Sequence, residues 1–148
     1  MKTETDALSD LYTTLIDSRD GYEQAAELID TPRLKSLFED MQSNRARQAE
    51  EVRAYLSDAN VELDDDGTLL AAAHRNFLSL REFVSNDDED IVEEVIRGER
   101  QLLDMYDEAI RPMDGDSDAY RFAKTQYEAL AERINQLEEE ERRLDIAS

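Results

Sequence analysis

The sequence predicts an all-α fold: an up-down bundle of four long helices with an additional shorter helix. Apolar residues recur at alternating spacings of three and four over five stretches, which is the period of an amphipathic helix. Only two Pro and four Gly interrupt the 148 residues, and 37% of the residues are charged, a composition that favours helices over sheets. The length suits one hydrophobic core. We therefore expect a single domain over residues 1–148, with a frayed polar N-terminus and a frayed acidic C-terminal tail.

The first two predicted helices form a hairpin. The first runs from about Thr5 to Ile29. The second follows Thr31, which is a favourable N-cap residue, and has Pro32 at its first helical position. Because so short a turn joins them, we expect these helices to be antiparallel neighbours.

Three further helices follow a polar connection that ends near Thr68. A shorter helix carries Leu70, Ala73, Phe77, Leu80 and Val84 on one face. The next begins after "SNDDED" and runs to about Arg111, and the last is capped by Asp116 or Ser117. A shorter helix between two hairpins indicates a crossover connection. The predicted architecture is therefore a ferritin-like up-down four-helix bundle with a shorter crossover helix.

The charge balance limits the classes of partner. The net charge is -21, which argues against binding to nucleic acid or to anionic membrane surfaces. There is no Cys, which excludes disulfides and thiolate metal sites. The chain lacks an apolar run of the ~20 residues that span a bilayer and a signal-peptide core, so we expect a cytoplasmic protein.

The acidic composition also suggests adaptation to high salt, because screening makes a dense carboxylate surface tolerable. This hypothesis predicts a higher unfolding midpoint in molar KCl than in dilute buffer. Equal midpoints in the two solutions would refute it.

Four segments carry a resemblance to a known family. In chain order they are "DGYEQAAE" at 20–27, "LKSLFEDMQSNRARQAEEV" at 34–52, "AAAHRNF" at 71–77 and "EVIRGERQLLDMYDEAI" at 94–110. Together they resemble a family of small bacterial four-helix-bundle proteins of unknown function in the ferritin-like superfamily. The resemblance implies a ferritin-like bundle and supplies no established activity. The family often carries a His near the position of Ala131, where this chain reads "ALAERI".

Glu99 raises the main functional question, because it falls in the middle of an apolar helix stripe. Buried charges are normally paired, and Arg suits a bidentate, partly buried contact with a carboxylate. Arg19 and Arg45 lie on the stripes of the first two helices near mid-height. We therefore predict a structural ion-pair and hydrogen-bond network. Its members are Arg19, Arg45, Gln48, Glu99 and Tyr127, with Tyr22 and Tyr106 as further partners.

A metal centre is the alternative reading of Glu99. A di-iron bundle takes a Glu from each of two helices and a Glu-x-x-His from each of the other two. No Glu-x-x-His occurs in the chain, whose only His is His74 on the shorter helix. A complete di-iron site is therefore not expected. A degenerate Fe or Mn site would draw on Glu23, Glu27, Glu51, Glu99 and His74.

Two kinds of residue have competing interpretations. His74 is interpreted as a boundary residue that bonds a neighbouring helix, the alternatives being a proton shuttle or a lone metal ligand. Gly21 and Gly98 lie within helices, where Gly costs ~1 kcal/mol relative to Ala, so we expect another group to pack closely against them.

The sequence favours a non-catalytic structural, interaction or stress-related protein that associates with itself and needs no cofactor. A metal-binding protein with a degenerate carboxylate site is the first alternative. A protein that binds an apolar small ligand between its helices is the second.

Overall fold

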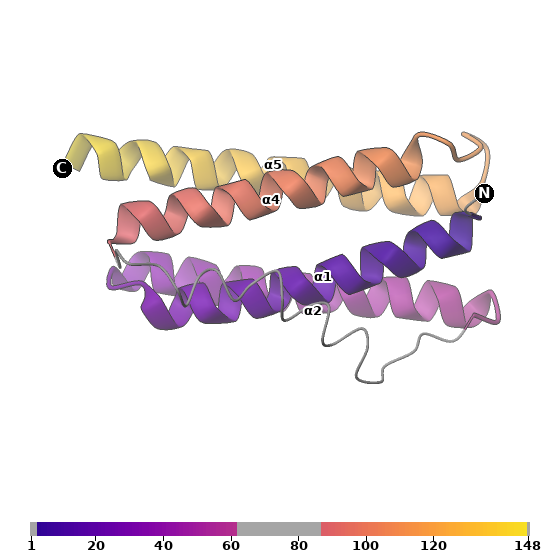
Figure 1. Cartoon of the computed structure of the whole chain (residues 1–148), viewed down its shortest axis with the longest axis horizontal. Coiled ribbons are helices and arrows are strands. Elements are labelled where there is room, and N and C mark those ends of the chain that lie inside the picture. The colour runs from indigo at the N-terminus through magenta and orange to yellow at the C-terminus, as the bar shows by residue number, and fades with distance from the viewer. Residues whose placement is uncertain (1–2, 62–86, 148) are drawn as a thin grey trace.

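The computed structural model describes residues 3–61 and 87–147. The four helices in these residues lie side by side along one direction (Figure 1). They are α1 (Glu4–Leu28), α2 (Pro32–Asp58), α4 (Asp88–Ile110) and α5 (Asp118–Ala147). The predicted all-α bundle is confirmed. The predicted shorter crossover helix, with Leu70 and His74, lies outside the described residues.

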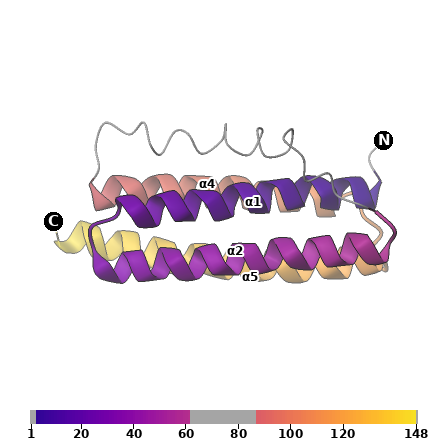
Figure 2. The same ribbon diagram turned by 90° about the horizontal axis from the view of Figure 1, so that it is seen from below.

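The helices form two antiparallel hairpins, α1–α2 and α4–α5. α2 ends at one end of the bundle and α4 begins at the other, which is the geometry of a crossover between hairpins (Figure 1). Figure 2, turned by 90°, shows α1 in front of α4 and α2 in front of α5. The two views together place α1 next to both α2 and α4.

Local hydrogen bonds fix where the helices begin. Thr3 and Asp6 form a capping box at the start of α1, in which the N–H of Asp6 donates to the Thr3 hydroxyl at 3.1 Å. At the start of α5, the N–H of Tyr120 donates to the hydroxyl of Ser117 at 3.0 Å. Of the two predicted caps, Ser117 therefore fills this role.

The turn between α1 and α2 corrects one prediction. Thr31 occupies the N-cap position of α2, but its side chain makes no capping hydrogen bond. The Thr31 hydroxyl donates instead to Asp88. The Asp88 carboxylate also accepts the N–H groups of Asp30 and Thr31, each at 2.9 Å. For the Thr31 hydroxyl, the charged carboxylate of Asp88 is a stronger hydrogen-bond partner than a backbone N–H at the start of α2. These hydrogen bonds connect the α1–α2 turn to the first turn of α4.

α5 continues as a helix to Ala147, past the polar stretch where fraying was expected. Ion pairs accompany this stretch: Arg142 pairs with Glu139 three residues before it, and Arg33 of α2 pairs with Glu140. The pair between Arg142 and Glu139 has the i,i+3 spacing at which opposite charges stabilise an exposed helix surface.

The apolar core consists of two clusters. One gathers around Leu11 and Leu102, and the other around Phe38 and Ile96. On each of α1, α2 and α4, the step from one cluster to the other passes through a buried polar residue. These residues are Ser18, Arg45 and Glu99. The bundle thus carries a polar layer between two apolar ones.

Candidate functional site

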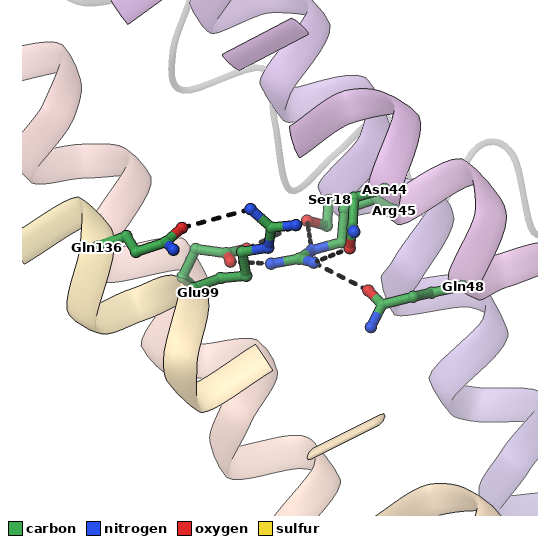
Figure 3. A network of polar contacts seen from close by, with 7 residues as sticks. Ser18, Asn44, Arg45, Gln48, Glu99 and Gln136 are labelled. Carbon is green, nitrogen blue, oxygen red and sulfur yellow. Dashed lines mark hydrogen bonds and ion pairs between the residues drawn. The ribbon is translucent and has the colours of Figure 1, made fainter. Parts of the chain in front are cut away.

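The polar layer is centred on an ion pair between α2 and α4. The Arg45 side chain has 0% of its surface exposed and the Glu99 side chain 3%, and the two are in direct contact. Figure 3 shows Arg45 reaching from its helix to Glu99. Both charged groups are desolvated, so the attraction between them has to offset the free energy of hydration that each loses.

Hydrogen bonds also engage the other two nitrogens of the Arg45 guanidinium (Figure 3). Its Nε donates to the hydroxyl oxygen of Ser18 at 3.2 Å, and Ser18 in turn donates to Glu99 Oε1 at 3.3 Å. Nη1 donates to Gln48 Oε1 at 2.9 Å and to Asn44 Oδ1 at 3.2 Å. Ser18 thereby links α1 to the pair, and three helices share one network. A buried pair in which each guanidinium nitrogen has a partner is the arrangement that such a pair requires.

A second chain of hydrogen bonds extends from the network to α5. The hydroxyl of Tyr106 donates to Gln126 Oε1 at 2.7 Å, and Gln126 Nε2 donates to the backbone carbonyl of Gln48 at 3.3 Å. Gln126 is 5% exposed. All four described helices therefore contribute a buried polar side chain to the central part of the bundle.

The ring of Tyr22 flanks the ion pair. The central guanidinium carbon of Arg45 lies 5.7 Å from the ring centroid of Tyr22, within the range of a cation–π contact. Phe38 packs on the same ring with a centroid distance of 5.9 Å. Burial raises the pKa of the Tyr22 hydroxyl well above its ordinary value, and the negative charge of Glu99 adds to this rise. Tyr22 therefore stays neutral beside the pair.

The protonation of Arg45 reflects two opposing effects. Burial is the largest single effect and lowers the pKa of Arg45, but the charge and hydrogen bond of Glu99 act together with the neighbouring phenols of Tyr22 and Tyr106, so the pKa is raised overall. For the neutral hydroxyl of Tyr106, burial has the opposite effect and raises the pKa. The layer thus holds one fixed positive charge and two neutral phenols around Glu99.

Two members of the predicted network lie apart from it. Arg19 is about one-third exposed and pairs with Asp20, with 3.0 Å between Nη2 and Oδ1. The stripe of α1 continues inward through Ser18, so Arg19 lies on the flank of the helix. Tyr127 is half-buried against the Leu11 cluster, under the ammonium group of Lys124 at 5.4 Å. Its neighbour Gln126 takes the inward position.

The candidate metal ligands do not meet around Glu99. Glu23, Glu27 and Glu51 have exposed side chains on the outer faces of α1 and α2. In residues 3–61 and 87–147, three or more His, Asp or Glu side chains nowhere gather in a way that could hold a metal ion. His74 lies outside these ranges. A metal at Glu99 would also face the guanidinium of Arg45, so the described residues do not fit the di-iron centre typical of this fold.

Ser18 and Gln126 belong to the buried polar layer but are not among the predicted network residues. Both continue the spacing of three and four along their stripes: Ser18 follows Leu15 by three and precedes Tyr22 by four, and Gln126 follows Ala123 by three. That spacing is the signal that identifies them. The close packing expected at Gly98 is also wrong, because a Cβ added there meets no atom within 4 Å.

The sequence of the chain was compared with protein-family models and with curated proteins. The family model described as "Domain of unknown function (DUF2383)" matches residues 3–112. No curated protein matches the chain. None of the described helices is long and apolar enough to cross a membrane.

Two solved structures share the fold. A conserved hypothetical protein from Mycobacterium tuberculosis has a TM-score of 0.64 at 16% identity, and the match covers 90% of this chain and 96% of that one. A two-domain protein from Anabaena variabilis, with DJ-1/ThiJ/PfpI-like and ferritin-like domains, has a TM-score of 0.69 at 20% identity. That match covers 95% of this chain and 40% of that one. The predicted ferritin-like bundle is thereby confirmed. Because the family model matches more than half of the chain, the chain belongs to the family described as a domain of unknown function, DUF2383.

Proposed function

We propose that this protein is a non-catalytic bundle that serves as a structural or interaction module. In this proposal the ion pair between Arg45 and Glu99 takes the place that a di-metal centre occupies in metal-binding ferritin-like proteins. The observation that carries the proposal is the fully buried guanidinium of Arg45, in contact with the one buried Glu of the described core. A resident cation supplied by a side chain leaves Glu99 no free charge for a metal.

The ion pair has a structural role in this proposal. Buried ion pairs add little stability compared with apolar packing, but they can fix how helices align along their axes. Here Arg45 meets Glu99 and Ser18 on two other helices at one level. A shift of one helix by a turn would separate the charges within an apolar interior. The network therefore favours one register of α1, α2 and α4.

Metal analysis tests the proposal against its first alternative. The full chain is purified from medium with added iron and manganese, then desalted and assayed for bound metal. We expect no stoichiometric metal, and we expect Glu99→Gln to have the same metal content as the wild type. Stoichiometric metal that Glu99→Gln abolishes would overturn the proposal. Glu139→Gln, at an exposed carboxylate of α5, is the matched control for loss of one negative charge.

We also propose that the protein associates with itself through polar helix faces. Obligate dimers bury large apolar patches. In the part of the chain that the structure describes, only Met105 and Ile146 are large apolar side chains with exposed surfaces. This surface favours a weak, salt-dependent association. Light scattering across a range of protein concentrations tests it, and a strictly monomeric protein at millimolar concentration would contradict it.

The charge of the molecule supports the exclusion of nucleic acid as a partner. A net charge of -21 repels a polyanion such as DNA or RNA. We expect no binding of duplex DNA or RNA by fluorescence anisotropy at 50 mM salt. Saturable binding under those conditions would refute this part of the proposal.

A further inference from the structure

A cavity of about 270 Å³ lies at the end of the bundle where α1 begins and α4 ends. Figure 1 shows these two helix ends at the same end of the molecule. The apolar part of the lining comes from both helices and from the turn after α4, and it consists of Ala7, Leu11, Met105, Ala109, Pro112 and Met113. Thr3, Glu4, Asp10 and Glu108 complete the lining. The cavity is therefore an apolar surface bordered by acidic groups.

Small and adaptable side chains shape the apolar surface of this cavity. Ala7 of α1 and Ala109 of α4 line it from two helices, and their short side chains leave room between them. Met105 is 37% exposed, and its sulfur accepts a hydrogen bond of 3.4 Å from the hydroxyl of Thr14 on α1. Methionine adapts to ligands of different shape, and an exposed apolar side chain gains free energy when a ligand covers it. The surface is thus suited to an apolar group.

The charges at the cavity are of one sign, because every charged residue in its lining is acidic. Glu4 accepts a hydrogen bond of 2.8 Å from the neutral hydroxyl of Ser117, which leaves its charge uncompensated. Within residues 3–61 and 87–147, neither Glu4 nor Glu108 forms an ion pair with Arg or Lys. Arg111, three residues after Glu108, pairs with Asp107 instead. The rim therefore carries negative charge that a cation would complement.

Size and charge together narrow the ligand class. An apolar cavity of ~150 Å³ is large enough to bind benzene, so about 270 Å³ accommodates one ring with a short arm. An anionic ligand would be repelled by the rim and by the net charge of -21. A cationic group at the rim keeps part of its hydration, because Glu108 and Pro112 are exposed. Such a group avoids the free-energy cost of full burial while its apolar body is covered.

We propose that the cavity between the start of α1 and the end of α4 binds a small hydrophobic amine, which is a single apolar ring joined by a short arm to an ammonium group. The ring packs against Ala7, Ala109 and Met105. The ammonium group lies at the rim, where it contacts the carboxylates of Glu4 and Glu108. This binding activity goes beyond the structural role proposed above, and neither depends on the other.

Three probes test the proposal on the full chain. Phenethylamine carries a ring and, at pH 7, an ammonium group; phenethyl alcohol has the same ring and arm without the charge, and ethylamine has the charge without the ring. Binding is followed by shifts of the backbone amides in NMR titrations. We expect saturable binding of phenethylamine, with phenethyl alcohol weaker by about five- to tenfold because two exposed ion pairs are lost. Ethylamine should be weaker by about tenfold or more, because no ring is removed from water.

Three variants separate the parts of the proposal, and thermal unfolding by circular dichroism verifies that each is folded. Glu108→Gln should weaken phenethylamine by about two- to fivefold, the range of one exposed ion pair, and leave phenethyl alcohol unchanged. Ala109→Leu should abolish binding of both ring probes by filling the cavity. Glu128→Gln, at an exposed carboxylate of α5 outside the cavity, is the matched control and should bind phenethylamine as the wild type does. Shifts of the backbone amides of Ala7, Ala109 and Met113 in the wild type locate the site without any substitution.

The results that would overturn the proposal are distinct. No saturable binding of phenethylamine to the wild type would refute the site. Equal affinities for phenethylamine and phenethyl alcohol would refute the role of the acidic rim, and equal losses in Glu108→Gln and Glu128→Gln would show that only the net charge of the molecule attracts the amine. Binding unchanged in folded Ala109→Leu would place the probe elsewhere. None of these results bears on whether Glu99 binds metal.

Discussion

Removal of the carboxylate at Glu99 is the perturbation that most strongly affects this fold. Glu99→Ala leaves the guanidinium of Arg45 fully buried with no counter-charge. It also removes the acceptor of the Ser18 hydroxyl and opens a small void between the two apolar clusters. Each of these consequences lowers the stability of the folded state and leaves the unfolded state almost unchanged.

The magnitude follows from burial. Two unit charges about 4 Å apart attract by about 4 kcal/mol at an effective dielectric constant of about 20. Breaking a buried pair by removal of one partner costs about 3–5 kcal/mol. Since Arg45 and Glu99 are 0% and 3% exposed, water screens this pair little. We expect Glu99→Ala to lower the free energy of unfolding by about 3–5 kcal/mol.

Urea unfolding followed by circular dichroism at 222 nm measures this loss. With a slope of about 2 kcal/mol/M, the midpoint should fall by about 1.5–2.5 M. Glu139→Ala is the control, because its pair with Arg142 is more than half exposed on both sides and should cost less than about 1 kcal/mol. A loss below about 0.5 kcal/mol for Glu99→Ala, as at an ordinary surface site, would refute the reasoning.

Three further predictions follow from the same contacts. Tyr106→Phe removes the donor to Gln126 and leaves a buried amide oxygen unpaired, so it should cost about 1–3 kcal/mol in urea unfolding. Asp88→Ala removes the acceptor of the backbone N–H groups in the α1–α2 turn, and it should cost about 1–2 kcal/mol in the same assay. Burial raises the pKa of Tyr22 above 10.0, so the folded chain keeps a proton that the unfolded chain releases at high pH. Its contribution should be fully present below pH 10 and decline above it by about 1.4 kcal/mol per pH unit, and Tyr22→Phe should remove that decline.

Matched substitutions serve as controls for these predictions. Tyr120→Phe changes a half-buried tyrosine outside the network and should leave the stability at pH 7 near that of the wild type. Asp107→Ala, at an exposed carboxylate of the same helix that pairs with Arg111, should cost less than Asp88→Ala. An alkaline slope that is the same in Tyr22→Phe and the wild type would contradict the buried, neutral phenol. Equal costs at Asp107 and Asp88 would contradict the link to the turn.

The helices could be predicted from the sequence because their signals are local. The helix bounds can be predicted to within a few residues from the apolar periodicity, the scarcity of Gly and Pro within the stripes, and the position of Pro32 at the start of α2. The role of Thr31 could not be predicted, because its partner Asp88 lies 57 residues away in the chain. Local capping rules cannot anticipate a competing acceptor that tertiary structure brings to the turn.

The polar layer could be predicted only in part. Arg45 and Glu99 each interrupt an apolar stripe, and this conflict between charge and position is visible in the sequence. The sequence pattern also allows Arg19 as the inward residue on α1, because a helix of 3.6 residues per turn lets a stripe advance by three or by four. The structure takes the step of three to Ser18, a small residue that leaves room for the guanidinium of Arg45. Periodicity alone does not decide between these steps.

The coupling energy between Arg45 and Glu99 tests the central claim most directly. A double-mutant cycle uses Arg45→Met, Glu99→Leu and the double variant, each measured by urea unfolding. If the two side chains are partners in a buried ion pair, each single substitution should cost about 3–5 kcal/mol, and the double variant should recover most of that loss because no unpaired charge remains. Single costs that simply add in the double variant would contradict the pair.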